Sequence, residues 1–422
     1  MTKSIFTENT PSGHECVIFT ISNTQPSLYL RPMARAVIFT APDQLKHNNT
    51  KTLHHKLLLI TNYRESNPRG GREMLCAINL TCLNEIFNDK LYVFHVQIVK
   101  QKGLLGVFKY LSGFIDGVTD EASSKAIALI RQECVTSVFI DGSNLGTIAM
   151  HIKIACPTVR VTTFFHNVEA SFFLGSFRLH PSLRSAVILF ANYIAERRSV
   201  DWSEQIICLN RRDSLWLSRL YGRGATHVSA LAIKNRFRGE FRYPSELSNP
   251  YALFVGGAFY GNLHGIRWYA KNVAAFAPLK TMVVGKGFDA YRNELEACGN
   301  LIVIGEAEEL SAWYLNALLI VAPIFEGSGM KTKVAEALMY GKKVIGSEEA
   351  FMGYEDALPD AGWVCRDSDE FIAAIGYAST ALTKDSDPAL RAIYQAHYSQ
   401  DAARARLHEI LCDTPQLRSS LQ

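Results

Sequence analysis

The sequence predicts an α/β protein in which two doubly wound parallel sheets follow one another. Its 422 residues are enough for two hydrophobic cores. Short apolar runs alternate with helix-like segments, which is typical of parallel sheets covered on both faces. A polar, proline-marked stretch at 237–250 interrupts the alternation, which then restarts. We therefore expect an N-terminal domain over residues 51–243 and a C-terminal domain over residues 244–395.

The first domain is expected to start after residues 1–50, which are polar and irregular and which we interpret as an extension or an extra edge segment. The apolar run at 57–61 is typical of a buried parallel strand. Further strands are expected at 91–99, 137–140, 159–165 and 205–209, and helices from 72 towards 87, at 122–134 and at 213–221.

The second domain is expected to begin with a strand at 252–255. Its other strands are expected at 281–284, 301–304, 318–322 and 344–345, and its helices at 266–276, 330–340, 371–378 and 388–396. Gly341 suits the left-handed residue that ends a helix. Since ligands of such sheets bind at the carboxyl ends of the strands, we expect the ligand cleft between the two domains.

Composition narrows the class of protein. The chain is 48% hydrophobic and 20% charged, as in soluble globular proteins. The longest apolar run, at 186–191, is too short to cross a bilayer, and the first 26 residues lack a signal-peptide pattern. Nine cysteines without a C-x-x-C pair indicate neither a disulfide framework nor a zinc site. We therefore expect a cytoplasmic protein.

The net charge of +4 hides an asymmetry, because basic residues predominate in 1–246 and acidic residues in 247–422. A basic half suits nucleic acid, an anionic membrane or a phosphorylated substrate. We expect no nucleic acid, since no known nucleic-acid-binding motif accompanies the charge.

A glycine-bracketed turn precedes the helix expected at 330–340, in the stretch GSGMKTKVAEALMYGKKVIG at 327–346. Lys331 and Lys333 lie where a helix prefers acidic side chains, which makes sense if an anion binds there. Glu336 shares the face of Lys333 and could accept hydrogen bonds from ligand hydroxyls. The alternative is an ordinary turn with a surface Lys333–Glu336 ion pair, and the spacing does not decide between them.

The order of motifs resembles the two-domain GT-B glycosyltransferases, in particular the family 4-like group that builds bacterial surface polysaccharides and capsules. The resemblance runs from about residue 57 to 411. Its most specific stretch is APIFEGSGMKTKVAEALMYGKKVIGSEEAFMGYE at 322–355, supported by FVGGAFYGNLHGIRWYAKNV at 254–273, FFHNVE at 164–169 and ICLNRRDSLWLSRLYG at 207–222. Residues 397–411 resemble the family's terminal helix, so we expect residues 396–422 to cross back to the N-terminal domain.

The resemblance implies transfer of a sugar from a nucleotide-sugar, of UDP or GDP type, to a glycan or lipid-linked saccharide, with no metal and no cofactor. Lysines and helix dipoles would stabilise the charge on the leaving diphosphate. The donor would be bound by the C-terminal residues Gly256, Gly257, Lys286, Glu306, Ser328, Gly329, Met330, Lys331, Lys333 and Glu336 and, across the cleft, by Gly70, Gly71 and Arg72.

His166 is our candidate for the catalytic residue, because it follows a strand and imidazole suits proton transfer near neutral pH. Glu169 could orient His166 or the acceptor, and Asp141 is an acceptor-side candidate. A buried structural role for His166 and a helix-stabilising role for Glu169 are the alternatives.

One feature departs from the pattern of this family, and another resembles a motif of a different class of glycosyltransferase. Many members carry two glutamates eight positions apart, but here Ser328 stands eight before Glu336. The motifs at 367–369 and 385–387, both Asp-Ser-Asp, imitate those of metal-dependent enzymes, and we interpret them as helix caps.

Residues 171–200 combine aromatic and leucine side chains with several arginines. We hypothesise that they rest on the inner face of the plasma membrane together with residues 100–114. The alternative is one core helix with basic residues facing solvent. For the whole chain, the alternatives to transfer are a catalytically silent nucleotide-binding scaffold and a nucleotide-sugar epimerase.

Overall fold

The computed structural model describes residues 55–63, 71–97, 103–238, 249–327 and 329–412. The molecule divides into Met1–His55 and Lys56–Gln422, and the elements below belong to the second part. The expectations for residues 1–50, for the domain boundary at 243/244, for Gly70 and for Ser328 lie outside the described residues.

The first sheet has six parallel strands in the order β2-β1-β3-β4-β5-β6. All five side chains of β1 are buried, because helices cover both faces of the sheet. The strand expected at 91–99 ends at His95. The six strands are β1 Leu57–Thr61, β2 Leu91–His95, β3 Ser137–Asp141, β4 Arg160–Phe165, β5 Gln205–Cys208 and β6 His227–Val228.

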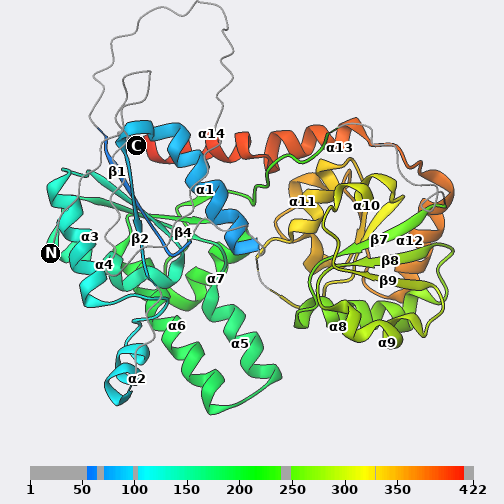
Figure 1. The fold of residues 1–422 in the computed structure, drawn as a ribbon, viewed down its shortest axis with the longest axis horizontal. Helices are drawn as coiled ribbons and strands as arrows, with labels where there is room; N and C mark the ends of the chain where they lie inside the picture. Colours follow the sequence, from blue (N-terminus) through cyan, green and yellow to red (C-terminus); the bar gives the residue numbers. More distant parts are fainter. Residues whose placement is uncertain (1–54, 64–70, 98–102, 239–248, 328, 413–422) are drawn as a thin grey trace, which may run out of the picture. The chain divides into compact units, whose positions relative to one another are not determined.

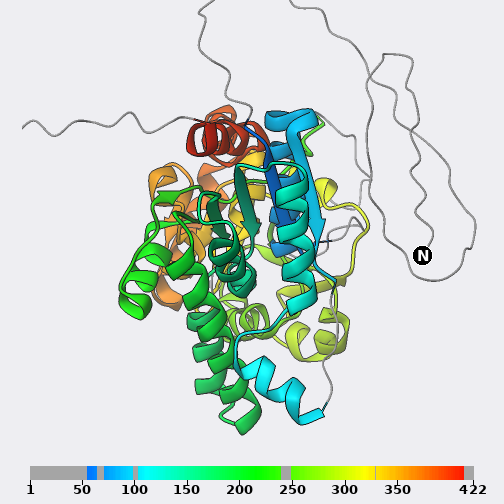
Figure 2. The same ribbon diagram turned by 90° about the vertical axis from the view of Figure 1, so that its left-hand side faces the viewer.

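Seven α-helices accompany this sheet in the described residues: α1 Gly71–Phe87, α2 Gly103–Leu111, α3 Asp120–Gln132, α4 Gly146–Ala155, α5 Glu169–Leu179, α6 Leu183–Trp202 and α7 Arg211–Tyr221. The single core helix considered for 171–200 is wrong, since the segment forms α5 and α6. Ser182 separates them and caps α6 by accepting from the Ser185 N–H. Helix α2 packs against α6, and both views place α2 beside the far end of the α5–α6 pair (Figures 1 and 2).

The second sheet also has six parallel strands, in the order β12-β11-β10-β7-β8-β9. Together the two sheets confirm the predicted α/β fold. The second set is β7 Tyr251–Val255, β8 Lys280–Val284, β9 Leu301–Gly305, β10 Leu319–Ala322, β11 Val344–Gly346 and β12 Gly362–Val364.

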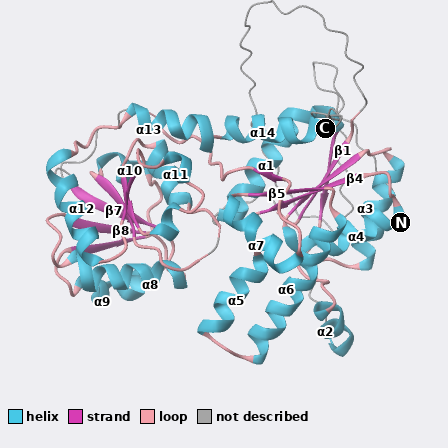
Figure 3. Ribbon diagram, turned by 180° about the vertical axis from the view of Figure 1, so that it is seen from behind, coloured by secondary structure: helices cyan, strands magenta, loops and turns pink. Residues whose placement is uncertain are grey.

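Helices surround the strands of this sheet as well (Figure 3). The caps expected at the two Asp-Ser-Asp motifs are confirmed, since Asp367 accepts from the Glu370 N–H and Asp387 from the Ala389 N–H. The helices are α8 Tyr260–Tyr269, α9 Arg292–Glu296, α10 Ser311–Asn316, α11 Thr332–Met339, α12 Ser368–Ala381, α13 Pro388–Ile393 and α14 Gln400–Cys412.

Helix α14 packs along α1 (Figure 1). Arg404 forms an ion pair of 2.7 Å with Glu85 of α1, and Gln205 of β5 donates to the Ile410 carbonyl at 3.1 Å. Among the described residues, no helix is both long enough and apolar enough to cross a membrane.

Candidate functional site

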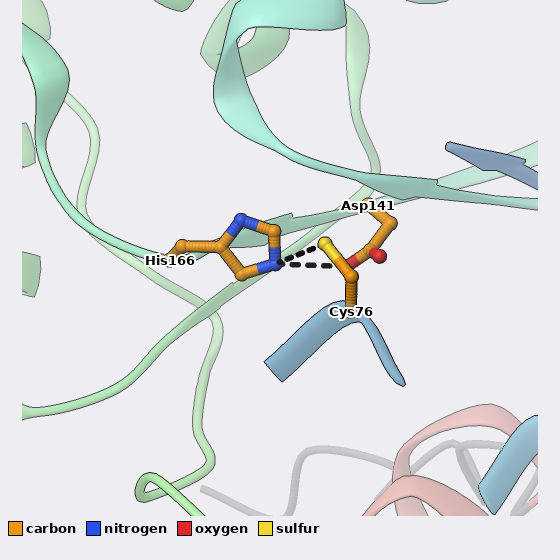
Figure 4. A group of neighbouring side chains, drawn as sticks. All are labelled: Cys76, Asp141 and His166. Atoms are coloured by element: carbon orange, nitrogen blue, oxygen red, sulfur yellow. Dashed lines mark hydrogen bonds and ion pairs between the residues drawn. The ribbon is translucent and has the colours of Figure 1, made fainter. Parts of the chain in front are cut away.

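Three buried side chains meet at the carboxyl edge of the first sheet (Figure 4). Asp141 is the last residue of β3, His166 directly follows the neighbouring strand β4, and Cys76 comes from α1. The His166 Nε2 atom lies 2.9 Å from Asp141 Oδ1 and 3.7 Å from Cys76 Sγ. The parallel register of β3 and β4 brings the ends of both strands to one place.

Asp141 determines which nitrogen of His166 carries the hydrogen. Burial alone would raise the pKa of Asp141, but the charge of His166 and hydrogen bonds from His166 and Asn79 hold it below its usual value. Asn79 Nδ2 donates to Asp141 Oδ1 at 2.8 Å and Thr61 Oγ1 to Oδ2 at 3.4 Å. Because an ionised carboxylate only accepts, His166 donates from Nε2. The neutral ring therefore carries its lone pair on Nδ1.

The cluster is not arranged as a cysteine nucleophile with a relay. In such a triad the carboxylate and the thiol contact different ring nitrogens. Here both contact Nε2, and burial raises the pKa of the Cys76 thiol far above its usual value. Asp141 instead holds the His166 ring through Nε2, so that the lone pair on Nδ1 is available to a ligand.

Glu169 opens α5 and is held by a second buried carboxylate, Glu196 of α6. Glu196 accepts from the Glu169 N–H at 2.9 Å, from the Ala170 N–H at 3.2 Å and from the Tyr221 hydroxyl at 2.7 Å. Burial raises the pKa of Glu169 and of Glu196 to about 7 each, and Arg72 opposes the shift of Glu169. Glu196 was missed from the sequence, where its only signal is a carboxylate following the apolar run at 186–191.

Helix α11 begins at Thr332, two residues later than expected, which makes Lys331 its N-cap residue. Lys331 Nζ lies 2.8 Å from Glu349 Oε1 and donates to the Gly329 carbonyl, while Arg212 of α7 pairs with the other oxygen of Glu349. Burial lowers the pKa of Lys331, and Glu349 opposes this shift. The bonds to Glu349 and Gly329 use two of the three N–H donors of the Lys331 ammonium.

Lys333 lies in the first turn of α11 and is buried. Its Nζ donates to Asn262 Oδ1 at 2.9 Å and lies 4.2 Å from the centroid of the Phe254 ring. Burial lowers the pKa of Lys333 to about 7, and Lys331 adds to the shift. The surface ion pair considered for Lys333 and Glu336 is therefore wrong: Lys333 is buried and bonds a neutral amide.

Glu336 is half-buried and accepts from the Tyr314 hydroxyl at 2.8 Å. Burial raises the pKa of Glu336, and the hydrogen bond from Tyr314 opposes the shift. The second oxygen of the carboxylate can accept a further hydrogen bond.

Gly256 leaves space for the Asn262 amide, which accepts the hydrogen bond from Lys333. Its φ of +152° lies in the region that favours glycine, and a Cβ added there would lie 2.5 Å from Asn262 Nδ2 and 3.5 Å from Lys333 Nζ. A side chain at this position would displace the Asn262 amide, whereas Lys333 Nζ would lie at an ordinary contact distance.

The remaining predicted donor residues have varied settings. Arg72 pairs with Asp116 at 3.2 Å, and Gly71 opens α1. The Met330 side chain is buried and its sulfur accepts from the Leu231 N–H, so it packs rather than faces a ligand. Gly257, Lys286 and Glu306 are exposed.

Gly329, in the turn before α11, approaches the backbone at His166. A Cβ added to Gly329 would lie 3.4 Å from the His166 carbonyl oxygen and 3.8 Å from Asn167 Cβ, and its φ is +65°. A pocket lies next to this turn, lined by Ser171, Phe172, Gly175, Arg178, Tyr260, Glu326 and Gly327. The arrangement therefore offers an imidazole, a buried ammonium and an adjacent aromatic pocket.

This fold is that of solved GT-B glycosyltransferases. HepE from Anabaena, solved with UDP, aligns with a TM-score of 0.60 at 15% identity over 84% of this chain and 99% of its own. Sucrose-phosphate synthase from Thermosynechococcus elongatus aligns with a TM-score of 0.59 at 13% identity, over 84% of this chain and 98% of its own. The lipopolysaccharide outer core galactosyltransferase WaaB aligns with a TM-score of 0.53 at 13% identity, over 84% of this chain and 98% of its own.

Residues 249–380 match the family described as Glycosyl transferases group 1. The chain thus has the fold of these glycosyltransferases, and its residues 249–380 match a glycosyl transferases group 1 domain. No curated protein sequence matches it.

Proposed function

We propose that this protein transfers a sugar from a nucleoside diphosphate donor to a hydroxyl of a glycan or lipid-linked saccharide, without a metal, in the synthesis of a surface polysaccharide. The observation that carries the proposal is the buried ammonium of Lys333, which bonds the neutral amide of Asn262 beside Gly256. A buried cation without a bonded carboxylate is costly, and an anionic ligand would offset that cost.

The donor diphosphate would lie at the start of α11. The backbone N–H groups of this turn and the ammonium of Lys333 would face the phosphates, and Lys331 would offer the N–H that its bonds to Glu349 and Gly329 leave available. As the bond from the sugar to the diphosphate breaks, negative charge develops on the leaving oxygen, and these groups would stabilise it. The free oxygen of Glu336 would accept from the ribose hydroxyls.

His166 would act on the acceptor or the sugar through Nδ1. The acceptor hydroxyl loses its proton as its oxygen bonds the sugar, and an imidazole lone pair is suited to hold that proton. Asp141 keeps the lone pair on Nδ1 through the 2.9 Å bond to Nε2 and is a positioning residue. Glu169 is held by Glu196 close to this position.

The acceptor would enter through the pocket between α5 and the start of α8. Phe172 and Tyr260 lie with ring centroids 6.1 Å apart and present apolar faces suited to a sugar ring. Glu326 and Arg178 supply polar groups at the same pocket.

Peripheral contact with the cytoplasmic face of an anionic membrane is the second part of the proposal. It rests on exposed apolar side chains next to basic ones on α2 and the α5–α6 pair. Leu105, Phe108 and Leu183 are 71%, 69% and 83% exposed. Arg178 and Arg184 are exposed at the turn between α5 and α6. A lipid-linked acceptor would be reached from such a surface.

The test is a thermal-shift screen of nucleotides, starting with UDP because the HepE structures contain UDP and UDP-glucose. We expect one nucleoside diphosphate to stabilise the native protein and to lose this effect in Glu336→Ala, with Glu336→Gln as the matched control that keeps the side chain's size. Product analysis with donor alone and with acceptors then separates the alternatives. Conversion of donor alone would indicate an epimerase, and nucleotide binding without any conversion would indicate a silent scaffold.

A further inference from the structure

The cluster of Cys76, Asp141 and His166 contains two residues of the proposed transfer, His166 and Asp141, and one that the transfer does not use, Cys76. An effect of this cluster on His166 therefore rests on the proposed function, whereas its ability to bind a cation does not. One sulfur, one oxygen and one nitrogen atom lie within 4.8 Å of one another, and all three residues are buried. We propose that these three side chains form a site for one Zn²⁺-type cation, and that its occupancy silences His166.

The donor atoms are those that zinc prefers. Thiolate, imidazole and carboxylate are the usual zinc ligands in proteins, and three protein ligands with one open position are common. The separations of 2.9 Å from Nε2 to Oδ1 and 3.7 Å from Nε2 to Sγ are close to those between ligands bound at about 2.0–2.3 Å to one ion.

The surroundings of the cluster also suit a metal. Asn79 and Thr61 donate to the two oxygens of Asp141, so the carboxylate is oriented by neighbours in the way that outer-shell groups orient metal ligands. Within the described part of the chain, this is the one group of three Cys, His, Asp or Glu ligand atoms that lie so close together. Its three residues are far apart in the sequence, so a motif such as C-x-x-C does not reveal them.

Binding of the cation releases one proton in total. Cation binding requires the Cys76 thiolate, so the thiol proton is released to solvent. The cation also takes the lone pair of His166 Nε2, so the hydrogen that Nε2 donated to Asp141 leaves and the ring carries its hydrogen on Nδ1 instead. Nδ1 then has no lone pair and cannot accept a proton from a hydroxyl. Zinc at Nε2 would therefore switch off the atom that the transfer reaction needs.

Cobalt titration of the full-length protein tests the site without relying on activity. After chelator dialysis under reducing conditions, we expect about one Co²⁺ per chain and a sulfur-to-cobalt charge-transfer band, both removed by Zn²⁺. Cys76→Ala and Cys76→Ser should lose the band. The matched control Cys134→Ser, which changes an exposed cysteine, should keep it. Cooperative thermal unfolding of each variant without ligand checks that the protein is folded.

Absence of the band in the native protein, or a band that survives in both Cys76 variants, would overturn the site. Zn²⁺ that fills the site yet leaves the rate of sugar transfer unchanged would overturn the silencing of His166. The result is separable from the proposed function, because the cobalt band reports the site even if no sugar is transferred.

Discussion

Lys333 Nζ and Asn262 Oδ1 lie 2.9 Å apart in a buried setting, with the Phe254 ring 4.2 Å from the same ammonium. The two residues come from the first turns of α11 and α8, at the carboxyl end of strands β10 and β7. A cation is thereby buried against an amide and an aromatic face. The chain would be more stable without that charge unless an anion binds there, and this links the stability of the protein to its ligand.

Replacing Lys333 with methionine should separate stability from binding. Lys333→Met removes the cost of burying an ammonium, so we expect the ligand-free protein to unfold at the same or a higher temperature. UDP affinity should fall by about 1.5–3 kcal/mol, or roughly 10- to 150-fold, because a charge-assisted hydrogen bond is lost. Thermal denaturation and calorimetric titration measure both effects. Lys280→Met, at an exposed lysine of β8, is the control, and unchanged UDP affinity in Lys333→Met would contradict the assignment.

UDP binding should take up protons above neutral pH. The pKa of Lys333 is lowered to about 7, so at pH 8 the amine is mostly neutral in the free protein, and a bound diphosphate would raise its pKa and draw in a proton. At pH 6 the amine is already charged and the uptake should vanish. UDP affinity should therefore weaken as the pH rises above 7. Calorimetry in buffers of different ionisation enthalpy measures the uptake, and equal uptake in Lys333→Met would sink the explanation.

Asp141→Asn should lower kcat with little change in nucleotide affinity. The neutral amide no longer holds the hydrogen of His166 on Nε2, so the productive tautomer is lost. We expect a decrease of about 10²- to 10⁴-fold in kcat, the range of a general acid–base contribution. Steady-state kinetics separate kcat from KM, and Asp120→Asn, at the exposed start of α3, is the control. A raised donor KM at unchanged kcat would show instead that Asp141 serves binding.

Membrane contact should depend on the exposed apolar residues of α2 and α6. We expect the native protein to float with vesicles containing anionic lipid at moderate salt, and Phe108→Ser with Leu183→Ser to abolish this, because the apolar area inserted into the interface is removed. Phe276 is 68% exposed and lies between α8 and β8, away from α2 and α6 in the sequence. The control variant Phe276→Ser should float like the native protein. No flotation of the native protein would refute the contact.

Both sheets could be predicted from local pattern, because a strand buried on both faces reads as a short apolar run. Strands β6 and β12 were not expected, since they have two and three residues and no such run. The strand expected at 91–99 ends at His95, which is paired with Thr61, the last residue of β1. The caps at Asp367 and Asp387 were expected for a local reason, a carboxylate just before a helix.

The site could be predicted only in part. The residue types at the glycine turn indicate an anion site, but spacing alone did not show that Lys331 pairs with Glu349, or that Lys333 pairs with Asn262, which is 71 positions away. Glu196 was not expected beside Glu169 for the same reason. In each case a partner distant in the sequence decides the charge balance.

Periodicity, glycine positions and motif order were thus sufficient for the fold class and for the segments that carry the chemistry, since these depend on interactions between residues close in the chain. Tertiary packing alone decided which nitrogen of His166 is presented, how deeply Lys333 is buried and that Cys76 joins Asp141 and His166. These properties depend on desolvation and on hydrogen bonds between separate elements, and such interactions leave no regular spacing in the sequence.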